Sequence, residues 1–211
     1  MPAHVPRVET LLKTLSVAVR LFLPRQVADW WEVSLPTAER TLRGLAGEGW
    51  LREVRIRARP LPPIEGPLCR WRPGDETPDF GWLSYEACRR MANRPVRVTV
   101  AYLASAKTVS HFGLVLRAPP KPHQQTHDVG LSQTYLHLLK KYPRLIARCW
   151  AGEDLLREQR EPGEKLEDAL LCHRHTRAPM LAVEYAGRYR RERFSALHQH
   201  LAARGLPYLV F

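Results

Sequence analysis

The chain has 211 residues, with 33 Lys and Arg against 21 Asp and Glu, and a formal net charge of +12 at pH 7. This length allows one large or two small domains, and the charge favours a polyanionic partner such as nucleic acid, although an arginine-rich genome would produce the same bias. No apolar run could span a membrane, the first residues lack a signal-peptide pattern, and the four cysteines have no CxxC spacing, so we expect a cytoplasmic protein with no membrane partner and no disulfide framework.

Three helices are predicted at the start of the chain. Apolar residues at helical spacing indicate a helix over 8–23, a second helix begins at Pro24, and a third follows Ser34, which is placed to cap it. This is the pattern of a helix-turn-helix, whose last helix enters a major groove of DNA. The residues of that helix expected to face outward are Thr37, Arg40, Thr41, Arg43 and Gly44.

A β-hairpin is predicted next. Residues 50–57 alternate apolar and charged side chains, 60–67 form a Pro-rich loop, and 68–72 return as a second strand. Such a hairpin is typical of the wing of a winged helix, used either to bind phosphates or to contact protein. The side chains expected to meet phosphates are Arg52, Arg55, Arg57, Arg59, Arg70 and Arg72.

The middle of the chain is predicted to connect two domains. A turn-rich break at 73–78 is followed by a helix over 83–91 and a strand over 94–103, and residues 117–126 have the composition of a linker. We therefore expect a winged-helix domain at 1–74, a connecting region at 75–126 and a C-terminal domain at 127–211.

The C-terminal domain is predicted to have the order αβββαβ. Its elements are a helix over 128–142 capped by Asp128, a strand over 145–150, two strands flanked by Asp168 and Glu184, a helix over 190–204 ended by Gly205, and a strand over 207–211. This order resembles the core of PD-(D/E)xK nucleases, the restriction-endonuclease-like fold. The fold class expected for the whole chain is therefore α+β or α/β.

Asp168 and Glu184 are the sharpest chemical feature of this domain. A hairpin that turns about Thr176 would place them directly opposite each other, with Cβ atoms about 5 Å apart. Two carboxylates at such a short distance repel each other unless a cation, a proton or a basic side chain lies between them. Asp168 and Glu184 are therefore the candidate catalytic residues and Mg²⁺ ligands. The segment Cys172 to His175 offers zinc-ligand chemistry but lacks a distant partner pair.

The resemblance to the nucleases implies a lysine two residues after Glu184, where this chain has Ala186. Arg188 or Lys165 would have to replace it, and an arginine is a poor base. We therefore expect a degenerate core without a cofactor, and the alternative is an active Mg²⁺-dependent nuclease.

Basic residues gather where the last long helix begins. Positive charge at a helix N-terminus is unfavourable, and a bound phosphate would offset it. The alternative is a solvated turn partly compensated by Glu192. The candidate DNA-binding residues in this cluster are Arg188, Arg190 and Arg191, with Arg193 beside them.

The whole layout resembles the plasmid replication-relaxation family, in which a winged helix precedes a degenerate nuclease-like domain. The matching stretches are His127-Asp128 before a helix with Tyr135, Trp150 with Glu153 and Leu156, Asp168 to Leu171, and Leu181 to Tyr185. The resemblance implies a regulator or accessory protein of a plasmid or other mobile element that binds double-stranded DNA during replication, mobilisation or transcription control. The C-terminal domain would then supply a homodimer contact or a second DNA contact. A protein-protein adaptor with incidental basic charge is the weaker alternative.

Overall fold

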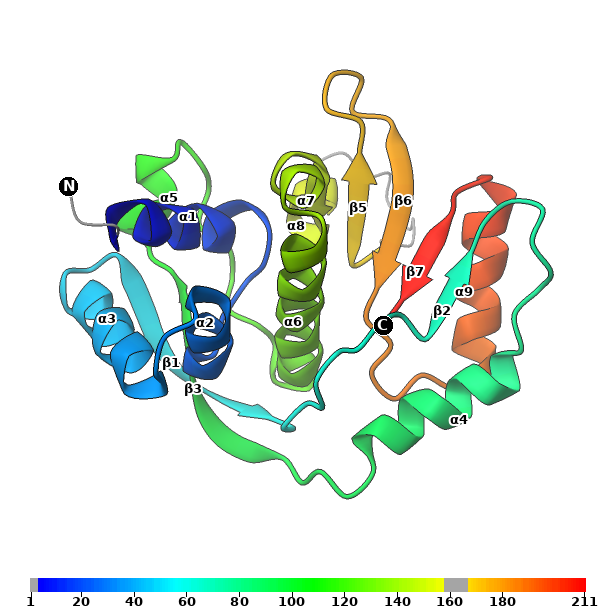
Figure 1. Cartoon of the computed structure of the whole chain (residues 1–211), viewed down its shortest axis with the longest axis horizontal. Coiled ribbons are helices and arrows are strands. Elements are labelled where there is room, and N and C mark those ends of the chain that lie inside the picture. The colour runs from blue at the N-terminus through cyan, green and yellow to red at the C-terminus, as the bar shows by residue number, and fades with distance from the viewer. Residues whose placement is uncertain (1–3, 158–166) are drawn as a thin grey trace. The chain divides into compact units, whose positions relative to one another are not determined.

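The computed structural model describes residues 4–157 and 167–211. The chain combines helices with two β-sheets and is a mixed α+β protein (Figure 1). It divides into two compact units, each built from two stretches of chain: unit 1 comprises Met1–Ala58 and Val96–Leu136, and unit 2 comprises Arg59–Pro95 and His137–Phe211. These boundaries differ from those predicted at residues 74 and 126. No helix in the described ranges has the length and apolar character needed to cross a membrane.

Unit 1 is built on helices and a two-stranded sheet. Its elements are α1 (His4–Val17), α2 (Pro24–Trp31), α3 (Leu35–Gly47), β1 (Leu51–Ala58), β3 (Arg97–Ala104), α5 (Ala106–His111), the 3₁₀ turn η1 (Pro122–Gln124) and the first part of α6 (Gln125–Lys141). Helices α2 and α3 begin at Pro24 and after Ser34, as predicted. The turn between them is formed by Glu32, whose φ of 55° reverses the chain.

Helix α1 ends six residues earlier than predicted, at Val17. The cause is distant in sequence: the backbone of Phe22 pairs with that of Tyr102 through hydrogen bonds of 3.0 and 2.9 Å. A residue that pairs with a strand is extended and cannot continue a helix. Both side chains are buried in the core of unit 1.

The predicted hairpin of 50–57 with 68–72 is wrong. Strand β1 pairs instead with β3, antiparallel, from Leu51↔Ala104 to Ala58↔Arg97. Strand β3 has eight residues, as β1 does, so all of β1 is paired. The C-terminal half of β3, Ala101 to Ala104, is buried in the core. Arg70 and the rest of β2 (Cys69–Trp71) belong to the other sheet, and so Arg70 and Arg72 do not frame this ribbon.

Unit 2 is organised around a five-stranded sheet of order β2-β7-β6-β5-β4. Only β6 and β7 run parallel, so α9 forms the crossover between them. The remaining elements are α4 (Phe80–Met91), α7 (Pro143–Cys149), β4 (Trp150–Gly152), α8 (Glu153–Arg157), β5 (Ala169–Cys172), β6 (Pro179–Glu184), α9 (Arg191–Ala203) and β7 (Tyr208–Val210).

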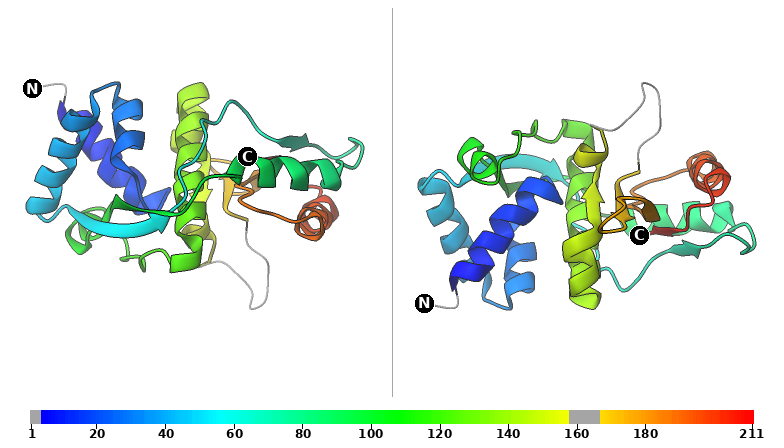
Figure 2. Two further views of the ribbon diagram at one scale, coloured as in Figure 1. Left: turned by 90° about the horizontal axis from the view of Figure 1, so that it is seen from below. Right: turned by 90° about the horizontal axis from the view of Figure 1, so that it is seen from above.

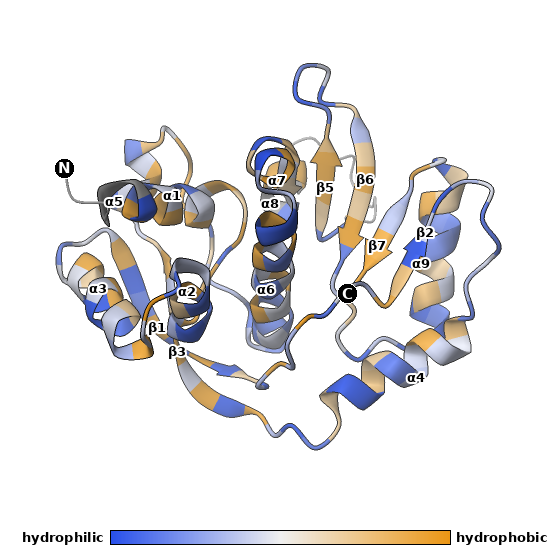
Figure 3. Ribbon diagram, in the orientation of Figure 1, coloured by the Kyte–Doolittle hydropathy of each residue, from blue (hydrophilic) through white to orange (hydrophobic). Residues whose placement is uncertain are grey.

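The core of unit 2 lies where α4 and α9 pack together beside the sheet (Figure 2). Trp71 stacks on Tyr208 with ring centroids 5.4 Å apart, and His198 meets Trp71 edge-on at 5.0 Å. The desolvation of His198 lowers its pKa, which favours the neutral imidazole within this aromatic group. Strand β5 is apolar along its whole length and buried at every residue (Figure 3).

Two predictions in the C-terminal region need correction. Residues 145–150 were expected as a strand, but α7 occupies most of them, because Ile146 and Cys149 are buried at helical spacing after Pro143. Asp128 was expected to cap a helix, but it lies inside the first turn of α6, 5% exposed and 3.7 Å from the Arg20 guanidinium. The last helix and its stop at Gly205, with φ of 60°, agree with the prediction.

Candidate nucleic-acid interface and carboxylate pair

Helix α3 has one buried side and one exposed side. Ala38, Leu42 and Leu45 are buried against α2 and β1. The helix begins where the Ser34 hydroxyl accepts the N–H of Thr37 at 3.4 Å, a bond that satisfies one of the open donors of the first turn. The opposite side therefore faces solvent along its length.

The residues of α3 that were predicted to face a DNA groove differ in their exposure to solvent and in their hydrogen bonds. Arg40 and Arg43 are exposed, and Arg43 also pairs with Glu39 at 3.2 Å. Thr37 and Thr41 are half-buried, and their hydroxyls hydrogen-bond to Ser34 and to the Thr37 carbonyl. The two arginines are thus the principal cationic donors of this surface.

Gly44 lies on the same exposed side of α3, where the absence of a side chain leaves space next to the backbone. It lies four residues after Arg40, and a Cβ built on it would meet nothing within 4 Å. A glycine inside a helix costs about 0.5–1 kcal/mol relative to alanine. No contact within the described part of the chain requires one at this position.

The ribbon of β1 and β3 gathers two of the predicted phosphate contacts. Arg55 and Arg57 are exposed and lie opposite Val100 and Val98 of β3 on one face. Arg59 follows the end of β1, is half-buried, and donates from its Nη1 to the Arg94 carbonyl at 2.5 Å. The ribbon therefore offers a shorter basic edge than the sequence predicted.

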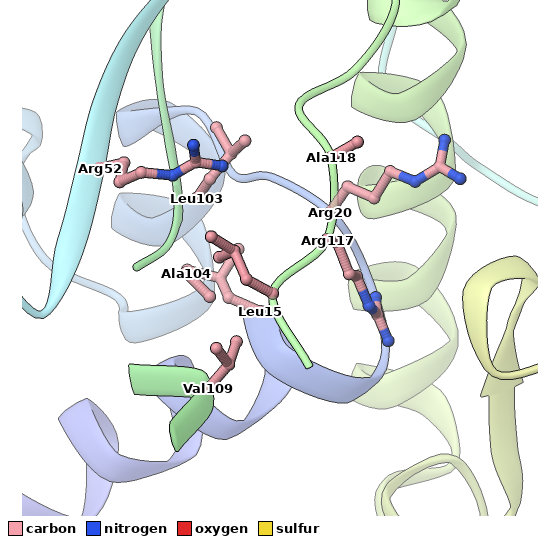
Figure 4. Close-up of a pocket in the computed structure, with 9 residues that line it drawn as sticks. Leu15, Arg20, Arg52, Leu103, Ala104, Val109, Arg117 and Ala118 are labelled. Atoms are coloured by element: carbon pink, nitrogen blue, oxygen red, sulfur yellow. The ribbon is translucent and has the colours of Figure 1, made fainter. Parts of the chain in front are cut away.

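A small hollow in unit 1 is lined by three arginines that were not predicted as a group (Figure 4). The hollow is lined by Arg20, Arg52 and Arg117 together with apolar residues such as Leu15 and Leu103. Its volume is about 10 Å³, which holds roughly one water molecule. It is therefore too small for a nucleotide or a metabolite.

The carboxylate pair has the register that the sequence predicts. Ala169 pairs with Val183 and Leu170 with Ala182, which sets Asp168 opposite Glu184 at the end of the β5–β6 hairpin. Glu184 is 3% exposed, and its Oε1 accepts the backbone N–H of Asp168 at 3.3 Å. Asp168 Oδ2 in turn accepts the N–H of Tyr185 at 2.8 Å.

Tyr189 and Arg193 lie beside this pair. Burial raises the pKa of Tyr189 well above its ordinary value, and the negative charges of Asp168 and Glu184 raise it further. Arg193 donates to the Tyr189 hydroxyl at 2.8 Å, and its guanidinium lies 3.9 Å from the ring centroid. Tyr189 thus lies between Arg193, which it contacts, and the two carboxylates whose charges affect its pKa.

The metal-binding chemistry of the pair is limited to two carboxylates. Within residues 4–157 and 167–211 no three His, Cys, Asp or Glu side chains gather in a way that could hold a metal ion. Ala186, at the position of the nuclease lysine, is buried. Lys165 lies outside the described residues.

Arg188, Arg190 and Arg191 are all exposed around the start of α9, with Arg190 at the N-cap and Glu192 in the first turn. On α4, Trp82 and Tyr85 are also exposed, by 51% and 65%. These two rings were not predicted as site residues, although their spacing of three residues on a helix is visible in the sequence.

Comparison with protein-family models, with curated proteins and with solved structures found no match to this chain.

Proposed function

We propose that the protein binds double-stranded DNA through unit 1, with α3 in the major groove and the β1–β3 ribbon as a wing. The exposed side of α3 carries the proposal, because it presents Arg40 and Arg43 from a helix whose other side is buried. Arginine binds guanine edges and phosphates with two donors at once. The net charge of +12 supports a polyanionic partner.

The proposed biological role is that of a cytoplasmic, non-enzymatic regulator or accessory factor of a plasmid or other mobile element. The resemblance of the sequence to the replication-relaxation family supports this role. Unit 2 would be a degenerate PD-(D/E)xK core that supplies a homodimer contact or a second DNA contact. The opposed Asp168 and Glu184, and the parallel β6 and β7 joined by α9, support that relationship.

Titration with duplex DNA tests the proposal. Arg40→Ala should weaken binding to the preferred sequence by about 1–3 kcal/mol, since a base contact is lost. Arg57→Ala should weaken binding to all sequences and flatten the dependence on salt. Arg174→Ala, which removes an exposed arginine from the turn between β5 and β6, is the matched control and should change little. Unchanged binding in an Arg40, Arg43, Arg57 triple alanine variant would refute the proposal.

A Mg²⁺-dependent endonuclease is the second candidate. The one observation in its favour is that Asp168 and Glu184 are opposed in register, as two metal ligands would be. The absence of a lysine at Ala186 weighs against it, because a water nucleophile then has no basic group to activate it. Nicking of plasmid DNA in Mg²⁺ or Mn²⁺ distinguishes the two candidates.

A further inference from the structure

Helix α4 carries an aromatic surface that duplex recognition by unit 1 does not use. Trp82 and Tyr85 are 51% and 65% exposed and lie three residues apart, on one side of the helix. The opposite side, with Leu83, Ala87 and Met91, is buried in unit 2. Single exposed apolar residues are common, but two large rings side by side on one helix form a continuous surface.

Charged residues of both signs surround these rings, and arginines outnumber carboxylates among them. The exposed side chain of Arg89 lies one turn further along, beside Tyr85, and forms an ion pair with Glu86 at 2.7 Å. Arg90 and Arg94 follow, close enough to the buried Tyr185 to affect its pKa. The acidic residues from Asp79 to Arg94 are Glu86 and Asp79, whose carboxylate accepts the Trp82 N–H at 3.0 Å. The Ser84 hydroxyl donates to the Tyr189 carbonyl at 3.1 Å, which fixes α4 against the loop that carries Arg188 and Arg190. Three arginines against two carboxylates over residues 79–94, with Arg188 and Arg190 on the adjoining loop, give this part of unit 2 a net positive charge that favours a polyanion.

We infer that Trp82 and Tyr85 form a stacking platform for the bases of single-stranded nucleic acid, with the neighbouring arginines on its phosphates. The rings project from a helix at neighbouring positions, with Cβ atoms about 5–6 Å apart, so that consecutive unstacked bases lie within reach. Bases inside a duplex already stack on each other and offer no free face. This activity is additional to the proposed duplex binding by unit 1 and stands independently of it.

The test uses the full chain and an oligo-dT of about 12 nucleotides, within the usual range for single-strand sites. Trp82→Ala with Tyr85→Ala should reduce affinity by about tenfold or more, since stacking on both rings is lost. The double Leu variant should be equally weak, because leucine keeps apolar bulk but cannot stack. The double Phe variant should recover most of the affinity. Both positions are exposed, so the variants should melt at the wild-type temperature.

Two controls show whether single-strand binding belongs to this surface alone. Tyr142 is an exposed aromatic elsewhere in unit 2, with the Lys141 ammonium 5.6 Å from its ring, and Tyr142→Ala should leave oligo-dT affinity unchanged. Arg40→Ala should weaken duplex binding without changing oligo-dT binding, and the Trp82, Tyr85 variants should do the reverse. Failure of duplex binding alone would therefore not affect this inference.

Fluorescence supplies a direct readout. All six tryptophans lie in the described part of the chain, and Trp82 is the exposed one among them. Oligo-dT should quench the wild-type emission and leave that of Trp82→Phe nearly unchanged. Unaltered oligo-dT affinity in the double Ala or double Leu variant would overturn the inference. So would a loss of self-association in those variants, measured by sedimentation, since the surface would then join two copies of the chain.

Discussion

Asp168 and Glu184 lie opposite each other at the end of the β5–β6 hairpin, and each carboxylate accepts a backbone N–H across it: Glu184 from Asp168, and Asp168 from Tyr185. Two opposed carboxylates would otherwise repel each other strongly in a buried setting. Backbone donors stabilise the charged form of a carboxylate, so these two bonds offset part of that repulsion. The pair thus has a structural role at the end of the hairpin, whether or not an ion also binds.

The first prediction concerns this pair. We expect no nicking of plasmid DNA in Mg²⁺ or Mn²⁺, because Ala186 supplies no basic group to orient a water. Asp168→Asn combined with Glu184→Gln should leave duplex affinity unchanged or slightly higher, since negative charge near phosphates is removed. Agarose-gel nicking and a DNA shift assay measure the two effects. Metal-dependent nicking that disappears in the double variant would establish the nuclease instead.

The parts of the fold that the sequence predicts correctly are those with local signals. The signals that start α2 and α3 are local, because Pro24 is the first residue of α2 and Ser34 is the N-cap of α3. The register of Asp168 and Glu184 follows from a short hairpin between two apolar strands. In each case the interacting residues are close in sequence, and so a short window contains the necessary information.

The errors arise where distant residues decide the structure. Phe22 is not part of α1 because its backbone pairs with Tyr102. Strand β1 pairs with β3, although β2 is nearer in the sequence. The apolar run that ends at Trp150 is too short for its hydrophobic periodicity to distinguish a strand from a helix. The structure has the helix α7 there. The same limit applies to the site, because the closeness of Tyr189 to the carboxylate pair depends on how the segment before α9 packs against the β5–β6 hairpin.

Glu167 gives a prediction about stability. Its carboxylate is 3% exposed and contacts both Arg204 Nη1 and, at 3.2 Å, His200 Nε2 on α9. Glu167→Gln keeps the shape but removes the charge, and should lower the free energy of unfolding by about 2 kcal/mol. Urea denaturation measures the change. Glu39→Gln, which removes the exposed partner of Arg43, is the control, and an equal loss there would contradict the assigned role of burial.

Tyr185 gives a prediction about pH. Its burial raises the pKa from 10.0 to about 12, while Arg90 and Arg94 act in the opposite direction. Since the folded pKa lies above the unfolded one, this contribution to stability is complete below pH 10 and is lost as the pH rises toward about 12. Denaturation at a series of alkaline pH values should show Tyr185→Phe losing less stability than the wild type. Parallel pH profiles would contradict the prediction.

Gly44 gives the last prediction, in which stability and binding change in opposite directions. Alanine there meets no neighbour and favours the helix, so Gly44→Ala should raise the free energy of unfolding by about 0.5–1 kcal/mol. If α3 lies in the major groove, the added methyl group crowds the DNA, and duplex affinity should fall by roughly 1 kcal/mol. Thermal melts and duplex titrations measure the two effects.

Gly47→Ala is the matched control, because Gly47 ends α3 and also has open space around its Cα. It lies at the C-terminal end of α3, one turn further than Gly44 from the residues that a helix-turn-helix places against the bases. The control should therefore change stability slightly and leave duplex affinity unchanged. A more stable Gly44→Ala variant with wild-type affinity would show that the exposed side of α3 does not approach DNA closely.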